Sequence, residues 1–375
     1  MRIKDICSGV TDGSHNPPQG LENSDYLMLS SKNVFDDKIT FDSPRYLSQI
    51  DFEQESKRTR IKSGDVLLTI VGTVGRAAVV GENMPQFTLQ RSVAVLHPNV
   101  EICDSRYLMY ALQANRNHIE SRAKGVAQKG IYLKEVADIE LQIPLLSEQT
   151  HRVKVLDKIA FVIKFHQKQL QKLDELVKAR FVEMFGDPEF NTFGWDTEEL
   201  GTLCDVGSSK RIYQNEQSQE GIPFWRISDL ISKMDIGVAD SGLFIPEERY
   251  VELKNAGLVP TTGDILVTSR GTLGRCYIIK DEDKFYFQDG MISWLSNYVD
   301  GITPLYLQYL FTMPGFRKQI DGMQAGSTVA YLSIAMLKKL RVMVPPIETQ
   351  NCFALFVEQL DKSKAVEGLY SSLCL

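Results

Sequence analysis

The chain has 375 residues, which is room for two or three domains. Its hydrophobic content of 43% and charged content of 24% are ordinary for a globular protein, and a net charge of −6 argues against a free-standing nucleic-acid binder. No apolar run approaches the roughly 20 residues that span a bilayer, and the N-terminus MRIKDICSG has no signal-peptide core. We therefore expect a cytoplasmic protein with no membrane partner. The six cysteines form no CxxC pair, so we expect neither a metal site nor disulfides.

Two segments of the chain repeat each other. Gly64–Val80 reads GDVLLTIVGTVGRAAVV, Gly263–Ile279 reads GDILVTSRGTLGRCYII, and eight of these 17 aligned positions are identical. The YLxY motif at Tyr107 also recurs at Tyr306, and the YL pair at Tyr132 recurs at Tyr331. The offset of 199 residues (263 against 64) is far longer than the roughly 20 to 50 residues of a solenoid unit. It indicates a duplicated domain, which suits the binding of two similar objects at a fixed separation.

Each copy begins with short alternating strands, as at 26–29 and 224–227. The GDxLxT strand follows and enters a tight GTxGR turn, where glycine permits a positive φ or a close approach of another backbone. Next come a helix, a glycine-bearing loop and a last strand with period-two alternation. In the first copy these three elements are predicted at 107–122, 124–130 and 139–143, and in the second at 304–320, 324–328 and 340–344. Each copy is thus an α+β unit with an antiparallel or mixed sheet.

A long helix is predicted between the copies, from Glu148 to about Phe185. This stretch lacks Gly and Pro, Ser147 is a suitable N-cap, and Gly186-Asp187-Pro188 ends it. Its apolar residues follow a heptad pattern, with His166 and Arg180 in two polar slots. A shorter helix begins near Gln350. The predicted coiled-coil residues are Leu156, Ile159, Ile163, Leu170, Leu173, Val177, Val357 and Leu360.

An apolar stripe of this length needs a partner. The simplest partner is the other linker helix, and the alternative is packing of each helix on its own domain. We accordingly divide the chain into a first domain at 1–147, a spacer helix at 148–186, a second domain at 187–347 and a C-terminal helix at 348–375.

No motif predicts a catalytic centre or a cofactor site. The GTxGR turns lack the Lys-Ser/Thr pair of a phosphate-binding loop and the glycine pattern of a dinucleotide fingerprint. They are either simple hairpin turns or turns whose amides and Arg76 or Arg275 face a polyanion. The Asn16-Pro17-Pro18 segment has Gln19 where an amino-methyltransferase motif would have an aromatic residue, so we interpret it as a turn or contact loop.

Polar side chains suited to DNA gather around both repeats. Arg, Lys, Asn, Gln and Ser are the types that hold phosphates or bind base edges, although each one singly is compatible with a solvated surface. The predicted DNA-binding residues are Ser14, His15, Asn16, Thr73, Arg76, Gln90, Arg91, Lys124, Gln128, Lys129, Lys210, Arg211, Arg226, Ser269, Arg270, Thr272, Arg275 and Gln288.

Over essentially its whole length the chain resembles the specificity subunits of type I restriction–modification systems. The resemblance rests on DGSHNPP at 12–18, the paired GDxLxTxxGTxGR segments, the hydrophobic-Pro-x-x-Glu-Gln junction at 143–149, and ARFVEMFGDPEFN at 179–191. The chain departs from the pattern at Thr349, which stands in place of the Glu, and in its short final helix.

The resemblance implies two target-recognition domains that each read half of a bipartite double-stranded DNA sequence. It implies that the helices form an antiparallel coiled coil, which sets the spacing and docks two methyltransferase subunits, with restriction subunits as further partners. It also implies that the chain needs no cofactor and is not itself catalytic. The competing hypotheses are a two-headed protein-binding adaptor and a nucleotide-dependent enzyme.

Overall fold

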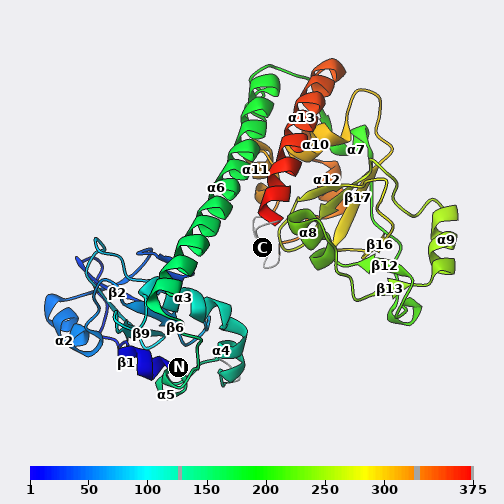
Figure 1. The fold of residues 1–375 in the computed structure, drawn as a ribbon. Helices are drawn as coiled ribbons and strands as arrows, with labels where there is room; N and C mark the ends of the chain where they lie inside the picture. The colour runs from blue at the N-terminus through cyan, green and yellow to red at the C-terminus, as the bar shows by residue number, and fades with distance from the viewer. Residues whose placement is uncertain (126–128, 325–329, 373–375) are drawn as a thin grey trace. The chain divides into compact units, whose positions relative to one another are not determined.

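The computed structural model describes residues 1–125, 129–324 and 330–372, with side chains up to residue 362. The chain divides into two compact units, Met1–Ile163 and Lys164–Leu375 (Figure 1). The boundary falls inside one long helix, α6 (Leu146–Phe185), so each unit contains one α+β domain and part of this helix. The four-part division of the chain stays a prediction.

In the first unit, a four-stranded antiparallel sheet has the order β1-β9-β6-β7, and a three-stranded sheet has the order β5-β2-β8. Alternate residues of β6 face opposite ways: Val66 and Leu68 pack with α3, whereas Leu67 packs with residues of β2 and β8. The elements are α1 (Ile3–Ile6), β1 (Cys7–Asp12), β2 (Tyr26–Leu29), β3 (Val34–Phe35), β4 (Lys38–Ile39), β5 (Arg45–Leu47), α2 (Gln49–Thr59), β6 (Val66–Thr69), β7 (Ala77–Val79), β8 (Phe87–Leu89), β9 (Val93–Pro98), α3 (Ser105–Ala114), α4 (Arg116–Arg122) and α5 (Leu133–Ala137).

The second unit repeats this plan. Its four-stranded sheet has the order β11-β17-β14-β15, and β12 pairs with β13 and β16 as β2 pairs with β5 and β8. The elements are β10 (Thr197–Glu199), α7 (Leu200–Leu203), β11 (Asp205–Gly207), a 3-10 turn (Gln214–Glu216), β12 (Ile222–Trp225), α8 (Ile227–Ile236), β13 (Phe244–Ile245), α9 (Glu247–Asn255), β14 (Ile265–Thr268), β15 (Cys276–Ile278), β16 (Tyr286–Phe287), β17 (Ile292–Ser296), α10 (Pro304–Leu310), α11 (Pro314–Gly322), α12 (Ile334–Lys338), β18 (Arg341–Met343) and α13 (Ile347–Ser372). The structure thus has the predicted duplicated α+β fold.

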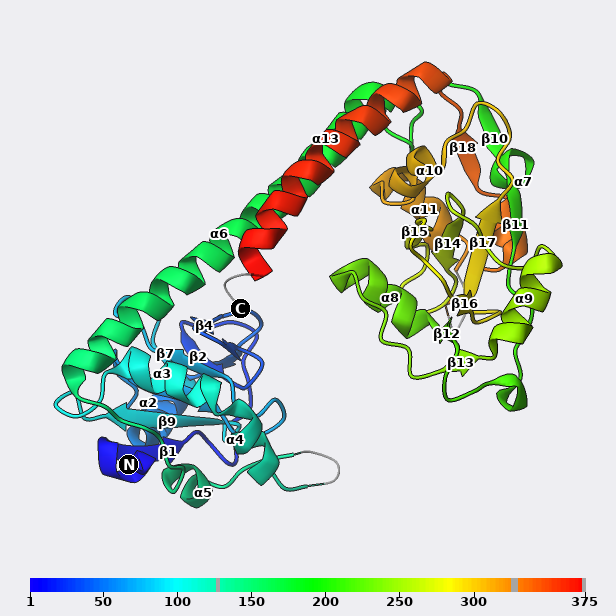
Figure 2. The same cartoon turned by 45° about the vertical axis from the view of Figure 1, so that its right-hand side comes forward.

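The two long helices pack against each other within the second unit. The part of α6 from Lys164 onward and α13 run side by side in opposite directions (Figures 1 and 2). Phe353 of α13 contacts the rings of Phe181 and Phe185 at centroid distances of 5.5 and 5.4 Å, and Arg180 lies over Phe356. The predicted antiparallel pairing of helix against helix is therefore confirmed.

The heptad residues differ in how deeply they are buried. Val177 and Val357 are buried, Ile159, Ile163, Leu170, Leu173 and Leu360 are half-buried, and Leu156 is exposed. Arg180, predicted to be a polar residue in the heptad pattern, lies where the two helices are in close contact. The adjacent Phe181 is fully buried, and the Arg180 guanidinium lies over the Phe356 ring. At the C-terminal end of α6, aromatic packing rather than a strict heptad pattern therefore holds α6 and α13 together.

Three local predictions were wrong. The long helix begins at Leu146, because the Leu145 carbonyl accepts from the Glu148 and Gln149 N–H groups, so Ser147 lies inside the first turn and is no N-cap. The helices predicted at 107–122 and 304–320 are each split in two. Asn115 separates α3 from α4, and Pro314, which lacks an N–H, starts α11.

The last predicted strand exists only in the second copy. There β18 pairs with β10, but in the first copy residues 139–143 make a single bridge, between Glu140 and Arg2. Ile139 and Leu141 are buried, and their backbone groups bond to Ile3 and Met1. The alternation of apolar residues at 139–143 therefore reflects burial against the N-terminal segment and not the hydrogen-bond ladder of a β-strand.

Candidate nucleic-acid interface

The GTxGR turn is closed in the same way in both units. The Thr69 hydroxyl accepts from the Arg76 N–H at 2.9 Å, and the Thr268 hydroxyl accepts from the Arg275 N–H at 2.9 Å. The N–H groups of Gly75 and Gly274 donate to the carbonyls of the same two threonines. Gly75 has a φ of 91° and Gly274 of 70°, values that L side chains rarely adopt. The turn is thus a preformed, rigid part of each unit.

The arginines of the two turns already have protein partners. The Arg76 guanidinium lies 4.9 Å from the centre of the Phe35 ring, and Arg275 Nη2 is 2.6 Å from Asp235 Oδ1. Thr73 and Thr272, at the tips of the turns, are exposed. Within each turn the threonine tip is therefore more accessible to a ligand than the arginine.

In the first unit, the turn meets the loops that carry the predicted DNA-binding residues. His15, Arg91 and Lys124 line one cavity of about 260 Å³ together with Val71 and Tyr132. His15 follows β1, Arg91 follows β8 and Lys124 follows α4, so three separate segments supply cationic or titratable groups. Glu135 accepts from Lys124 Nζ at 2.8 Å and raises the pKa of this lysine, which is fully charged at neutral pH.

The glycine-bearing loop is held directly on the turn. The Gly72 N–H donates to the Lys129 carbonyl at 3.0 Å, and the Ile131 N–H donates to the Ile70 carbonyl at 2.9 Å. Lys124 and Gly130 exchange both backbone hydrogen bonds. Lys129 is exposed on this loop, whereas the predicted residue Gln128 lies outside the described part of the chain.

A buried carboxylate positions His15. Asp12 accepts from Arg58 of α2 with one oxygen and contacts His15 Nε2 at 2.8 Å with the other. Asp12 is buried while His15 is exposed. The intervening Gly13 is tightly enclosed, because a Cβ at this residue would lie 2.1 Å from the Leu89 carbonyl oxygen. The DGSH segment is therefore a packed loop that presents one imidazole.

The second unit forms a corresponding cavity of about 410 Å³. Arg211, Arg270 and Gln288 line it, and they lie in segments that correspond to those of the first unit. Arg211 Nε donates to Asp289 at 2.8 Å, and the Arg270 guanidinium lies 5.0 Å from the centre of the Tyr331 ring. The Leu332 N–H donates to the Ser269 carbonyl, as the Ile131 N–H does to that of Ile70 in the first unit.

The remaining predicted residues are not equally accessible. Ser14 and Ser269 are buried, and the Ser269 hydroxyl contacts the Ser293 hydroxyl at 2.7 Å. Gln90 is half-buried, whereas Asn16, Lys210 and Arg226 are exposed. The sequence analysis missed Arg58, Tyr132 and Tyr331 as members of these sites. The repeated YL pair was a usable signal for the tyrosines, and nothing near Arg58 in the sequence indicated its contact with Asp12.

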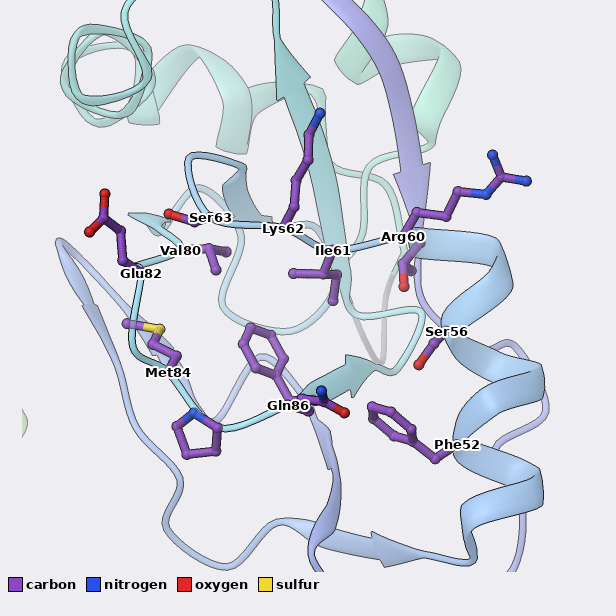
Figure 3. Close-up of a pocket in the computed structure, with 14 residues that line it drawn as sticks. Phe52, Ser56, Arg60, Ile61, Lys62, Ser63, Val80, Glu82, Met84 and Gln86 are labelled. Carbon is purple, nitrogen blue, oxygen red and sulfur yellow. The ribbon is translucent and has the colours of Figure 1, made fainter.

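A further cavity in the first unit, of about 300 Å³, holds none of the predicted residues. Phe52, Ser56, Ile61, Met84 and Gln86 surround it (Figure 3). It lies where β6 begins and β7 ends, whereas the GTxGR turn joins the opposite ends of these strands. It is therefore separate from the candidate interface.

The described residues contain neither a metal-ligand cluster nor a membrane-spanning helix. No group of three or more His, Cys, Asp or Glu side chains gathers as metal ligands there. Within the same part of the chain, no helix combines the length and the apolarity needed to cross a bilayer.

The sequence profile of the family described as "Type I restriction modification DNA specificity domain" matches residues 2–175 and again 193–369. The chain belongs to this family. The two matches cover the two structural copies, and this specificity subunit has two target-recognition domains.

Individual proteins agree with this assignment. A Haemophilus influenzae protein named as a type I restriction enzyme specificity subunit is 28% identical over 294 residues, which are 72% of this chain and 68% of that protein. The MjaVIII specificity subunit of Methanocaldococcus jannaschii is 24% identical over 82% of this chain and 74% of its own. The crystal structure of the type I S subunit from M. genitalium has the same fold, with a TM-score of 0.55 and 16% identity, over 100% of this chain and 92% of that one.

Proposed function

We propose that the two recognition domains each read one half of a bipartite double-stranded DNA target, through the cavities that contain His15, Arg91 and Lys124 in the first unit and Arg211, Arg270 and Gln288 in the second. The observation that carries the proposal is that one scaffold appears twice with different side chains at corresponding places. Ile70-Val71 precedes the GT pair in the first turn, and Ser269-Arg270 precedes it in the second. Different side chains on a common frame suit two different half-sites.

The proposal also assigns DNA methylation and DNA cleavage to partner subunits. The chain itself would be non-catalytic and would dock methyltransferase subunits, with restriction subunits joining the complex. Its net charge of −6 supports this division, because DNA affinity depends heavily on phosphate neutralisation, with a logarithmic salt slope of roughly −0.9 per contact. The complex with its methyltransferase subunits should have a much steeper salt slope than the chain alone.

A matched pair of substitutions tests the reading of two half-sites. Arg91→Ala and Arg270→Ala each remove one exposed guanidinium from one domain. In the assembled methyltransferase, the first should weaken or relax recognition of one half-site and the second that of the other, by about 1 to 3 kcal/mol for a lost bidentate base contact. The measurement is a genome-wide map of methylated bases in cells that carry each variant.

Thr202→Ala provides a control, since this exposed side chain of α7 lies outside the second cavity. Loss of both half-sites to the same extent with either arginine variant would contradict independent reading. Methyl transfer by the purified chain with only a methyl donor would contradict the non-catalytic assignment.

A further inference from the structure

The same buried glutamine side chain occurs near the start of each long helix. Gln149 is the fourth residue of α6 and Gln350 the fourth residue of α13, and their exposed fractions are 0% and 1%. Buried polar side chains need hydrogen-bond partners, since an unmade bond costs more than a made one contributes. In both amides the oxygen and the two N–H groups all have partners.

The backbone partners of the two amides are equivalent, and Gln350 Oε1 also accepts from the Thr303 hydroxyl at 3.1 Å. Gln149 Oε1 accepts from the Asp104 N–H at 2.9 Å, and its Nε2 donates to the carbonyls of Ile102 and Pro144 at 2.9 and 2.8 Å. Gln350 Oε1 accepts from the Thr303 N–H at 2.9 Å, and its Nε2 donates to the carbonyls of Gly301 and Pro345 at 2.8 and 2.9 Å. One amide thus joins three backbone positions in each domain.

These bonds connect the start of the long helix to the start of a domain helix. Asp104 and Thr303 are the N-caps of α3 and α10, and their side chains accept from the N–H groups of Tyr107 and Tyr306. The tyrosine hydroxyls in turn donate to the carbonyls of Gln142 and Met343, just before the long helices. The repeated YLxY motif and the repeated glutamine therefore belong to one junction that occurs twice.

A second contact lies further along each helix. In the first unit, Asp157 accepts from Arg106 and from the Tyr110 hydroxyl of α3. In the second, Phe353 lies 5.3 Å from Tyr309 of α10, measured between ring centres. Two contacts at different positions along a helix determine its direction, whereas a single contact would let the helix pivot.

We infer that Gln149 and Gln350 are positioning residues, which set the direction in which each long helix leaves its recognition domain and thereby the separation of the half-sites. This inference rests on the proposed function. From Gln149 to Phe185 the helix covers about 54 Å at about 1.5 Å per residue. A tilt of about 3.6° at the junction would move its far end by about 3.4 Å, the rise of one base pair.

Glutamate is the sharpest replacement, because it keeps the shape and the acceptor oxygen of glutamine, while its carboxylate can donate neither of the two hydrogen bonds. We would prepare Gln149→Glu, Gln350→Glu and Gln149→Leu. Gln167→Glu on the exposed side of α6 is the matched control. The first readout is the gap between half-sites in the methylation map of the assembled methyltransferase.

The expected result is a gap that shifts or broadens by about one base pair in the junction variants, with the bases of each half-site unchanged, and no change in the control. An unchanged, sharp gap in variants that still methylate DNA would overturn the inference. Uniform loss of methylation at all sites, without any change in gap, would likewise overturn it, because the glutamines would then serve stability alone.

A second readout does not depend on DNA. Spin labels at Glu53 of α2 and Ala160 of α6 both lie in the first unit on exposed positions, and Cys352 and Cys374 are replaced by serine to prevent labelling there. We expect one narrow distance distribution in the parent and the control, and a broader or shifted one in Gln149→Glu or, should that variant fold poorly, in Gln149→Leu. Equal distributions would refute the positioning role. A broadened distribution combined with no methylation of a bipartite site by the parent would leave the positioning role standing and reject the proposed function.

Discussion

Phe353 should be the residue on which the attachment of α13 depends most. Its side chain is fully buried, and its ring centre lies 5.5 Å from that of Phe181, 5.4 Å from that of Phe185 and 5.3 Å from that of Tyr309. The neighbours come from α6 and α10, so the ring joins three helices of the second unit. Removal of a buried phenylalanine typically costs about 3 to 5 kcal/mol, and each lost aromatic pair contributes about 0.5 to 1.5 kcal/mol of this.

We therefore expect Phe353→Ala to lower the unfolding free energy of the second unit by about 3 to 5 kcal/mol. The three tryptophans of the chain, Trp195, Trp225 and Trp294, all lie in this unit. Tryptophan fluorescence, excited at a wavelength that tyrosine does not absorb, thus reports urea unfolding of the second unit without a signal from the first. With a denaturant slope of about 3 kcal/mol per molar, the midpoint should fall by roughly 1 M or more.

Leu355→Ala is the control, because this side chain sits two residues further along the same helix and is 61% exposed. It should change the unfolding free energy by no more than about 0.5 kcal/mol. Equal losses in the two variants would refute the reasoning, since the burial of Phe353 between α6 and α10 would then contribute nothing specific.

Further predictions concern the contact loop, the thiols and the spacer. Gly13→Ala should disrupt the DGSH loop, because its Cβ would lie 2.1 Å from the Leu89 carbonyl oxygen, and methylation mapping should show loss of the half-site read by the first domain only. Burial raises the pKa of Cys7 and Cys103 to about 12 each. At pH 8 both should therefore remain protonated and react slowly with iodoacetamide, while the exposed Cys352 reacts first, as peptide mass spectrometry would record. Insertion of one heptad after Ile163 should lengthen the gap between methylated half-sites by roughly 10 Å, about three base pairs, and an unchanged gap would contradict the spacer role of the helix.

The duplicated fold could be predicted because its signals are local and repeated. The GDxLxT strand, the two glycines of the turn and the stretch of 148–185 without Gly or Pro are each recognised from residues close together in sequence. The failures have the opposite character. Residues 139–143 alternate like a strand, but their backbone partners are Met1 and Ile3, at the far end of the domain sequence, and burial there produces the same alternation as a ladder.

The candidate interface was predictable only by residue type. His15, Arg91 and Lys124 come together because β1, β8 and α4 end at the same place, which no spacing in the sequence expresses. Arg76 illustrates the converse. Its repetition at Arg275 suggested contact with a polyanion, yet these two side chains contact Phe35 and Asp235 of their own domains. A repeated residue can thus be repeated because the scaffold needs it.

The distinction between scaffold and contact residues fits the proposal that one chain reads two different half-sites. Thr69 and Thr268, Tyr107 and Tyr306, and Gln149 and Gln350 are identical pairs, and each of these side chains bonds to backbone groups inside its own domain. A hydrogen bond to a backbone group does not depend on which side chain that residue carries. These pairs can therefore hold the same backbone scaffold in both domains. The side chains that face the two cavities have partners close by, such as Asp12 for His15, Glu135 for Lys124 and Asp289 for Arg211. These side chains differ between the two domains, whereas a change in either junction glutamine would remove hydrogen bonds to the backbone and, with them, the helix direction that sets the separation of the half-sites.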